Sequence, residues 1–299
     1  MITGEKIQTL CDYYIGTNED FNFNPIIKNQ TSKHINLDNY NIEIIKNLRV
    51  KNIFCYTHLI DGKIENFNNN LKNISIILSN ISTKFNIIFH NSDGAFKNEH
   101  KSILQISNVN KIFTQNLSIE PEERIIPLPI GIANSMWAHG NLNIWNNILN
   151  SIDLSKKTEL IYFNFNINTY NKGDYTQLLC IQKRKKCYDV ISKMNIPNIE
   201  NKNYMDYLKI LSIYKFAICP EGNGLDTHRF WECLYLKVIP ICLKNNITEY
   251  YSKFFPIFLL DKWEELNTEN IDNYYNNSTW NNYNILHFEH FLQFFEINK

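Results

Sequence analysis

The chain has 299 residues and carries 30 acidic and 30 basic side chains, so its formal net charge at pH 7 is zero. Such a length predicts about two domains. A composition of 44% hydrophobic and 20% charged residues is typical of a globular protein and argues against long disordered tails. The balanced charge argues against a nucleic-acid partner, because the one basic cluster, Lys183 to Lys186, is too short to hold a phosphate backbone.

The N-terminal residues MITGEKIQTL contain no apolar core of a secretory signal, and no apolar run reaches the roughly 18 residues of a membrane span. Seven cysteines form no CxxC pair, and Cys55, Cys219 and Cys242 lie inside apolar runs, as buried thiols do in a reducing compartment. We therefore expect a soluble cytoplasmic protein with no membrane span, no disulfide framework and no structural zinc.

The first half of the chain alternates between helical and strand-like segments. A helix is predicted first, a β-type strand and then a buried strand follow, and the apolar segment between those strands fits a helix or a strand. The segments are Glu5 to Tyr14 (helix), Asn52 to Tyr56 (strand), Leu71 to Ser79 (helix or strand) and Asn86 to Phe89 (strand).

A polar cluster follows the strand predicted over Asn86 to Phe89. It reads His90-Asn91-Ser92-Asp93-Gly94. Polar side chains gathered where a strand ends indicate a site in an α/β domain.

The alternation continues to the C-terminus. Prolines and glycines between Ile125 and Gly140 predict an ordered loop near a domain boundary, which we place near Asn150. The two predicted domains are 1–150 and 151–299. The expected later elements are the strands Lys111 to Thr114, Leu160 to Phe163 and Ile257 to Leu260, and the helices Lys183 to Met194, Tyr204 to Ile213 and Phe288 to Phe295.

The stretch Phe216 to Ile241 carries the most specific pattern in the chain. Two short apolar runs, Phe216 to Cys219 and Val238 to Leu243, flank a glycine-containing loop and a helix whose N-cap is Asp226 or Thr227. A strand–loop–helix–strand unit requires a parallel sheet, and ligands bind at the carboxyl ends of parallel strands. The loop is therefore expected to lie at a binding site.

The side chains of this stretch suit a phosphorylated sugar. At 3.6 residues per turn, His228, Arg229 and Glu232 share the helix side that faces the loop, beside N–H groups that favour an anion. Glycines in the loop permit close approach of the backbone to a ligand, and carboxylates accept hydrogen bonds from sugar hydroxyls. The predicted nucleotide-sugar-binding residues are Glu221, Gly222, Asn223, Gly224, Asp226, His228, Arg229 and Glu232. Without a ligand, Arg229 and Glu232 would be an ordinary i,i+3 pair on a solvated helix.

This stretch resembles the exostosin-like (GT47-type) glycosyltransferases of GT-B architecture, including those of large DNA viruses. The resemblance rests on Cys219-Pro220, Gly222, Gly224, Arg229, Glu232, Leu234 and Ile239-Pro240. It implies two Rossmann-like α/β domains, a last helix that crosses back to the N-terminal domain, and donor binding in the C-terminal domain. It also implies that Arg229 contacts the diphosphate and Glu232 the ribose or sugar.

Two positions depart from that family. Glu221 stands where the family usually has a basic residue, which leaves the donor's identity open. Lys237 stands where the family has a glycine, which weakens the stop signal of the helix.

Sugar transfer needs stabilisation of the departing diphosphate and, in an inverting reaction, a base for the acceptor hydroxyl. We expect the base in the N-terminal domain, with Asp93 as first choice and His90 as second; a lone aspartate in a polar loop can also be a turn residue. The chain has no Asp-x-Asp triplet, so we expect no metal and no other cofactor. The expected partners are a nucleotide-sugar donor and a glycan or glycoprotein acceptor.

Several residues outside this pattern carry weaker signals. The basic residues Lys183 to Lys186 lie at the start of a predicted helix, where positive charge interacts unfavourably with the helix macrodipole. A bound anion would offset this unfavourable interaction, which makes Arg184 a second candidate phosphate contact. The alternative is that these residues form a solvated lysine face. We interpret His58, His139, His287 and His290 as structural or surface residues. Neither GxxxxGK[ST] nor GxGxxG occurs. Another α/β enzyme acting on nucleotide-sugars, such as an epimerase, and a non-catalytic nucleotide or glycan binder remain alternatives.

Overall fold

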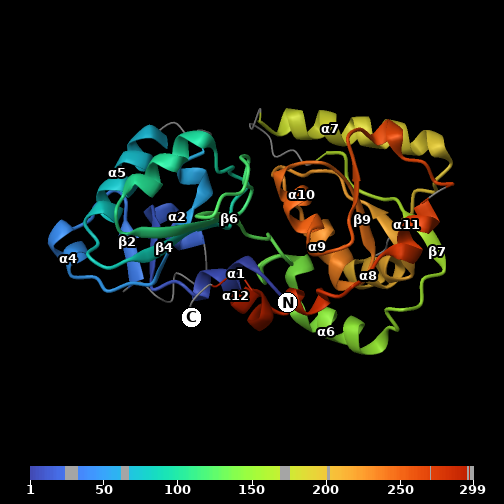
Figure 1. Ribbon diagram of the computed structural model, residues 1–299, viewed down its shortest axis with the longest axis horizontal. Helices are drawn as coiled ribbons and strands as arrows, with labels where there is room; N and C mark the ends of the chain where they lie inside the picture. The colour runs from blue at the N-terminus through green and yellow to red at the C-terminus, as the bar shows by residue number, and fades with distance from the viewer. Residues whose placement is uncertain are drawn as a thin grey trace. The chain divides into compact units, whose positions relative to one another are not determined.

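The chain forms two compact units. The computed structural model describes residues 1–23, 33–61, 67–168, 176–200, 203–269, 271–294 and 296. One unit, here called the six-stranded unit, comprises Thr3–Ile130 together with Phe295–Lys299, and the other, the four-stranded unit, comprises Gly131–Phe294 together with Met1–Ile2. Both contain a parallel sheet with helices packed on it, so the predicted fold class of two Rossmann-like α/β domains is confirmed (Figure 1).

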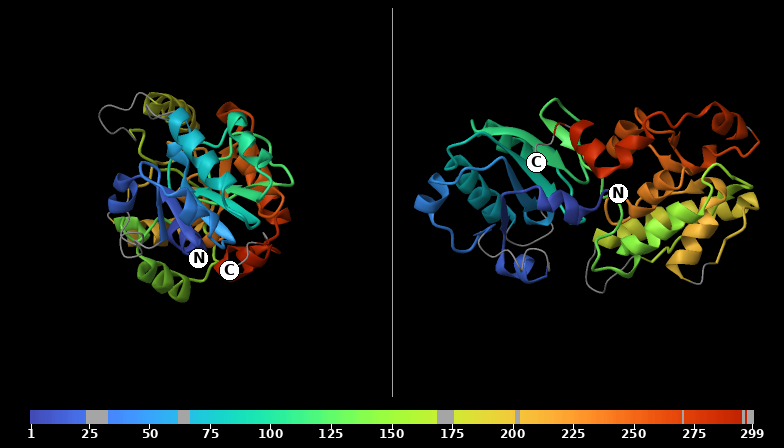
Figure 2. Two further views of the ribbon diagram at one scale, coloured as in Figure 1. Left: turned by 90° about the vertical axis from the view of Figure 1, so that its left-hand side faces the viewer. Right: turned by 90° about the horizontal axis from the view of Figure 1, so that it is seen from below.

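The sheet of the six-stranded unit has the order β2-β1-β3-β4-β5-β6, and every pair of neighbouring strands is parallel. Its strands are β1 (Tyr13–Gly16), β2 (His34–Asn36), β3 (Asn52–Tyr56), β4 (Phe85–His90), β5 (Val109–Thr114) and β6 (Ile125–Pro127). Its α-helices are α1 (Gly4–Thr9), α2 (Asn18–Phe23), α4 (Ile42–Lys46) and α5 (Phe67–Ser79). Figure 2 (left) faces this unit, with the blue-to-green strands at its centre and helices around them.

The strand order of this sheet reverses direction between β1 and β3. From β1 the chain first adds β2 on one side and then β3 and all later strands on the other. The central strands β3 and β4 are buried along their whole length, as continuous apolar runs in a doubly covered sheet should be. In such sheets the reversal point opens a crevice at the carboxyl ends of the strands, where ligands bind.

The sheet of the four-stranded unit has the sequential order β10-β9-β8-β7 and is also fully parallel. Its strands are β7 (Glu159–Tyr162), β8 (Tyr214–Ile218), β9 (Ile239–Leu243) and β10 (Phe258–Leu260). Its α-helices are α6 (Leu142–Ser151), α7 (Thr176–Ile191), α8 (Tyr204–Ser212), α9 (His228–Tyr235), α10 (Asn246–Ser252), α11 (Ile271–Asn277) and α12 (Phe288–Phe294).

Helices cover both faces of the four-stranded sheet. On one face, Phe216 and Ile239 pack with Cys187 and Ile191 of α7 in a buried cluster. On the other, the Tyr162 ring lies 5.9 Å from that of Tyr207 in α8. Figure 1 shows α7 and α8 on opposite sides of these strands. The carboxyl ends of the strands are therefore where loops can form a site.

Two predicted helices have different bounds in the structure. The helix predicted over Glu5 to Tyr14 ends at Thr9, and Tyr13 already begins a strand. The Asp12 carboxylate accepts hydrogen bonds from the backbone N–H groups of Lys51 (2.6 Å) and Asn52 (3.1 Å), which ties the start of β1 to β3. This contact between distant segments ends the helical pattern, and the prediction of one long helix was wrong.

The helix predicted to begin at Lys183 begins at Thr176. Lys183 to Lys186 consequently lie in the middle of α7, away from the positive end of its dipole. The inference that these cations need an anion because they start a helix was therefore wrong, and any role of Arg184 must rest on its own contacts.

The division between the units falls between Ile130 and Gly131, whereas the sequence placed a boundary near Asn150, which lies within α6. Gly131 has a φ of 66°, and a side chain there would overlap the Ile2 backbone. At the other end, α12 belongs to the four-stranded unit, while Glu296 pairs with Lys111 of the six-stranded unit at 2.9 Å. The chain thus returns to the six-stranded unit after its last helix.

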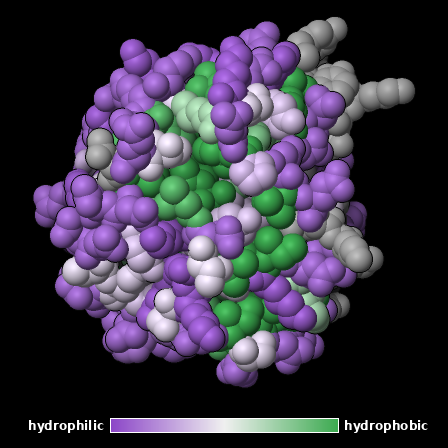
Figure 3. Space-filling model, turned by 90° about the vertical axis from the view of Figure 1, so that its right-hand side faces the viewer, coloured by the Kyte–Doolittle hydropathy of each residue, from purple (hydrophilic) through white to green (hydrophobic). Residues whose placement is uncertain are grey.

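Figure 3 shows one face of the surface, where hydrophobic residues are exposed among mostly hydrophilic ones. Apolar atoms on a folded surface are ordinary. Within the described residues, no helix is both long and apolar enough to cross a membrane.

Candidate functional site

The candidate site of the four-stranded unit lies where β7 and β8 end. These strands are parallel neighbours, with Tyr162 opposite Ala217, so the segment Asn164 to Asn166 and the loop Cys219 to Thr227 leave the sheet at the same edge. Residues far apart in the chain, on β7, α7, β8 and α9, are brought together there.

The loop after β8 is fastened to the helix that follows it. The Asp226 side chain is buried, and its two oxygens lie 2.8 and 2.9 Å from the indole N–H of Trp231. One of them also accepts from the backbone N–H of Thr227, the N-cap of α9. The structure thus gives Asp226 the role of an anchor for the loop, while its predicted contact with a sugar stays a prediction.

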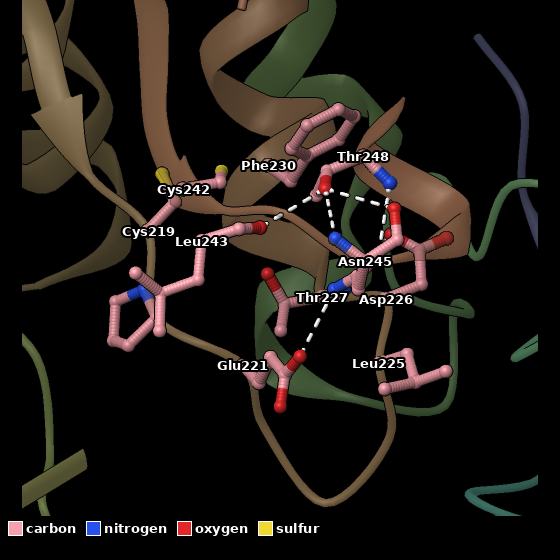
Figure 4. Close-up of a pocket in the computed structure, with 11 residues that line it drawn as sticks. Cys219, Glu221, Leu225, Asp226, Thr227, Phe230, Cys242, Leu243, Asn245 and Thr248 are labelled. Atoms are coloured by element: carbon pink, nitrogen blue, oxygen red, sulfur yellow. Dashed lines mark hydrogen bonds between the residues drawn. The ribbon is translucent and has the colours of Figure 1, made fainter. Parts of the chain in front are cut away.

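The interior of this loop is too small for a nucleotide-sugar. Figure 4 shows Glu221, Asn245 and Thr248 converging beside Phe230 and Cys242. Glu221 Oε1 accepts from the Asn245 side chain at 3.0 Å, and the enclosed space measures about 10 Å³. A volume of that size holds one water molecule at most. Any larger ligand must lie outside the loop.

The loop glycines do not have conformations that other residues avoid. Gly131 is the one glycine recorded with a positive φ among the described residues, so Gly222 and Gly224 are not in that class. The Gly222 N–H donates to Gly224 O at 3.2 Å, and a Cβ on Gly222 would meet only the Thr227 methyl group at 3.3 Å. The predicted role of Gly222, Asn223 and Gly224, close approach to a ligand, stays a prediction.

Arg229 lies in the first turn of α9 with its guanidinium over two aromatic rings. Its Cζ is 4.7 Å from the centre of the Tyr207 ring and 5.4 Å from that of Tyr162. Nη1 donates to Asn164 O at 2.7 Å, and 22% of the side chain is exposed. Cation–π contacts fix the plane of such a group, and only one of its five N–H donors is engaged in a recorded hydrogen bond within the described residues.

Glu232 lies three residues after Arg229 in α9, and its side chain is almost completely buried. Its Oε1 accepts a hydrogen bond from the Tyr204 hydroxyl at 2.8 Å and its Oε2 from the Tyr207 hydroxyl at 2.6 Å. The Arg229 Nε atom is 4.0 Å from Oε2. Burial, together with the Glu232 carboxylate, raises the pKa of both tyrosines, which keeps their hydroxyls protonated as donors. Glu232 therefore holds the aromatic support of Arg229 in place, and its predicted contact with a ribose stays a prediction.

Arg184 reaches the same edge from α7. Its Nη1 donates to Glu221 O at 2.9 Å and its Nε to Asn166 O at 2.7 Å, while Cζ lies 4.9 Å from the centre of the Phe165 ring. Burial lowers the pKa of Arg184, and the positive charge of Arg229 adds to the shift. Lys183, next to it, pairs with Glu221 at 2.6 Å. The two arginines thus lie close enough to repel, and both hold the segment after β7.

His228, the first residue of α9, is anchored by its ring. Its Nδ1 lies 2.8 Å from Gly131 O, and since a carbonyl only accepts, this nitrogen carries the proton. The His139 ring lies 5.9 Å away. His228 is only half-buried, so its predicted part in anion binding stays a prediction.

The two predicted base residues lie in the six-stranded unit in different surroundings. His90 is fully buried at the end of β4, with Nε2 3.0 Å from Pro129 O and Nδ1 3.2 Å from Asn91 Oδ1. Both ring nitrogens are thus engaged away from solvent, which suits a structural role. Asp93 is exposed in the loop after β4. Its role as a base stays a prediction.

Similarity to known proteins is low. No family model matches the chain, and no curated protein matches it. Among solved structures, the chain is similar to Methanocaldococcus jannaschii UDP-GlcNAc 2-epimerase, crystallised in complex with UDP-GlcNAc and UDP. The two share 14% sequence identity with a TM-score of 0.32, over 85% of this chain and 78% of that one.

The sequence did not predict the support beneath Arg229. Tyr162, Tyr204 and Tyr207 come from β7 and α8, and Trp145 of α6 donates to the Tyr204 hydroxyl at 3.0 Å. The usable signal was the polar segment after the strand ending near Phe163, at the same sheet edge as the glycine loop. No group of three or more metal-ligating side chains occurs in the described part of the chain.

Proposed function

We propose that the four-stranded unit binds the diphosphate of a nucleotide-sugar through Arg229 and Arg184, and that the protein is a glycosyltransferase. The sugar would pass to a hydroxyl of a glycan or glycoprotein, with inversion and without a metal ion. The exostosin-like pattern from Cys219 to Pro240 supports this reading.

The proposal depends on the exposure, orientation and hydrogen bonding of the Arg229 guanidinium. It is partly exposed, oriented by two rings and bonded through Nη1 to one carbonyl, so donors remain for a ligand. An arginine offers paired N–H groups that match the oxygens of a phosphate. Arg229 is therefore built to receive an anion.

The second arginine strengthens the same conclusion. Arg184 and Arg229 repel one another in a partly buried setting, and an anion between or beside them would offset that repulsion. A diphosphate leaving group develops negative charge as the sugar departs, so two fixed cations stabilise the transition state more than the ground state. These side chains would then do what a metal ion does in other sugar transferases.

A binding experiment tests the proposal. Thermal unfolding is followed with UDP-, GDP- and CMP-sugars, because a ligand that binds only the folded state raises the melting temperature. We expect one nucleotide class to stabilise the wild type. Arg229→Ala should weaken its affinity about 10- to 100-fold, since a hydrogen bond to a charged group contributes about 1.5–3 kcal/mol, and Arg184→Ala should weaken it less.

Arg124→Ala is the matched control. Like Arg229, Arg124 donates to backbone carbonyls, those of Val109 and Asn110, but it lies in the six-stranded unit. Its replacement should leave nucleotide-sugar affinity unchanged. Equal affinity in the wild type and Arg229→Ala would refute the proposal.

Product analysis then separates the alternatives. Transfer to an added acceptor supports a glycosyltransferase. A changed or hydrolysed nucleotide-sugar without transfer would indicate another nucleotide-sugar enzyme. Binding without any turnover would indicate a nucleotide or glycan binder.

A further inference from the structure

The six-stranded unit contains a cavity at the point where its strand order reverses. It measures about 540 Å³, within the roughly 300–1,000 Å³ range of small-molecule sites. Its walls come from the last residue of β3 and from the segments that follow β1, β3 and β4, at the carboxyl ends of parallel strands on both sides of the reversal. The polar and aromatic residues of its lining include Thr17, Glu19, Asp20, Tyr56, His58 and Asn91.

A histidine–aspartate pair lies in the wall of this cavity. His58 Nε2 is 2.8 Å from Asp20 Oδ1, and Asp20 Oδ2 accepts from the backbone N–H and the hydroxyl of Thr17 at 2.8 and 2.9 Å. Only 9% of the Asp20 side chain is exposed, against 34% for His58. Burial alone would raise the pKa of Asp20, but the hydrogen bonds from His58 and Thr17 outweigh it and hold this pKa below its ordinary value.

The pairing selects one tautomer of the His58 ring. An ionised carboxylate only accepts hydrogen bonds, so in the neutral ring Nε2 carries the proton and Nδ1 has a free lone pair. Within the described residues, Nδ1 has no recorded hydrogen-bond partner, and the side chain is partly exposed. The pair therefore presents a proton acceptor held in orientation by a buried carboxylate.

The backbone beneath His58 is fixed by the polar cluster that follows β4. The His58 N–H donates to Ser92 Oγ at 3.0 Å, and the same hydroxyl accepts from Gly94 N at 3.3 Å. Gly94 packs so closely that a Cβ would lie 2.8 Å from His58 N. Ser92 and Gly94 of this cluster thus hold the backbone of His58 in place.

The charge of the cavity identifies its ligand class. Glu19 and Asp20 contribute carboxylates, and among the described lining residues there is no lysine or arginine, so an anionic ligand is disfavoured. Asn91 adds an amide, and Tyr56 adds an aromatic ring beside His58, with 5.4 Å between ring centres. Amide and carboxylate groups next to a ring suit a neutral, hydroxyl-rich molecule.

We infer that this cavity binds a carbohydrate acceptor and that His58, positioned by Asp20, accepts the proton of its reacting hydroxyl. The inference rests on the proposed glycosyltransferase function. The hydroxyl O–H bond breaks and the proton goes to His58 Nδ1. The oxygen forms a bond to the anomeric carbon of the nucleotide-sugar, whose bond to the diphosphate oxygen breaks, and the diphosphate leaves with the electron pair.

The test of the reaction compares His58→Ala with the wild type and with His290→Ala, an exposed histidine outside the cavity. Transfer from UDP-, GDP- and CMP-sugars to methyl glycosides is measured. His58→Ala should lower kcat about 10²- to 10⁴-fold, as expected for loss of a general base, with nucleotide-sugar affinity unchanged. Added imidazole should restore part of the rate in His58→Ala only. Wild-type turnover in His58→Ala would overturn the inference while the proposed function stood.

Asp20→Asn tests the positioning role. It should lower kcat with little change in KM for the methyl glycoside, because the imidazole remains but loses its orientation and the charge that stabilises its protonated form. A change in KM alone would contradict this role.

A second measurement is independent of any donor. The His58 ring of histidine-labelled protein is followed by NMR, which reports its tautomer and its response to methyl glycosides. We expect the Nε2–H tautomer and a shift of the His58 signals with at least one glycoside, whereas His290 should not respond. A proton on Nδ1, or no response to any glycoside, would overturn the inference even if nucleotide-sugar binding is confirmed. A response without nucleotide-sugar binding would support the cavity and refute the proposed function.

Discussion

The two units gather polar side chains at the same kind of place, the carboxyl edge of a parallel sheet, but they do so differently. In the four-stranded unit, Arg229 and Arg184 present positive charge around a closed loop that encloses about 10 Å³. In the six-stranded unit, His58 and Asp20 line an open cavity of about 540 Å³ that contains carboxylates and no lysine or arginine among its described walls. Under the two proposals, the opposite charges at these equivalent sheet edges would separate anion binding in one unit from proton acceptance in the other.

The largest effect is expected when the buried carboxylate that holds the tyrosines beside Arg229 is removed. Glu232→Leu would leave the Tyr204 and Tyr207 hydroxyls without their buried acceptor. We expect a loss of about 3–5 kcal/mol in the free energy of unfolding, the range for breaking a buried polar pair. Urea denaturation measures it, with the exposed Glu249→Leu as control, which should change stability by less than about 0.5 kcal/mol. Equal stability of the two variants would show that Glu232 is not structural.

The second prediction concerns Asp20 and its dependence on pH. Since the folded pKa of Asp20 lies below its ordinary value, the carboxylate stabilises the fold above the unfolded pKa, about 3.9, and loses this contribution as pH falls through the folded value. Asp20→Asn should therefore cost about 1.5–3 kcal/mol at pH 7. The difference from the wild type should shrink as pH falls below about 4.

Unfolding in urea at several pH values measures this difference, with the exposed Asp38→Asn as a control for the change in net charge. A difference that stays constant down to pH 2 would contradict the pairing with His58 and Thr17.

The third prediction compares the stability cost of replacing one glycine in each unit by alanine. Gly94→Ala places a methyl group 2.8 Å from the backbone nitrogen of His58, and we expect a loss of about 1–3 kcal/mol. Gly222→Ala meets only the Thr227 methyl at 3.3 Å, so its cost should stay below about 1 kcal/mol. If Gly222→Ala nevertheless weakens nucleotide-sugar binding, the predicted close approach of a ligand is supported. Thermal unfolding and ligand titration of both variants decide the matter.

The smallest expected effect is at the end of α9. Lys237 has a φ of 52°, a left-handed conformation that costs a side chain about 1 kcal/mol, and its ammonium lies 4.9 Å from the centre of the Tyr283 ring. Lys237→Gly should raise stability by at most about 0.5 kcal/mol, because the relieved strain of about 1 kcal/mol is partly offset by the lost cation–π contact, about 0.5–1 kcal/mol. Lys237→Ala keeps the strain and loses the contact, so it should be slightly destabilised. A Gly variant no more stable than the Ala variant would exclude strain at this position.

The sequence predicted the glycine loop of the four-stranded unit well because its residues are contiguous. A buried strand, a loop, an N-cap and a helix leave a readable order of residue types, and β8, α9 and β9 follow the predicted bounds closely. The helix over Glu5 to Tyr14 was predicted too long because a backbone contact from β3 to Asp12 overrode the local pattern. The pairing of His58 with Asp20 was likewise not predicted, because no neighbouring residue in the chain marks it.

Sequence by itself determined the α/β class, the buried parallel strands and the edge at which a site could form, because each of these depends on the local succession of apolar and polar residues. Tertiary structure alone decided which groups meet there. Asp20 and His58 are 38 positions apart, and Asn164 and Arg229 are 65 apart. Hydrogen bonds of this kind depend on which strands become neighbours in the sheet, and strand order is set by the packing of the whole unit rather than by any short stretch of it.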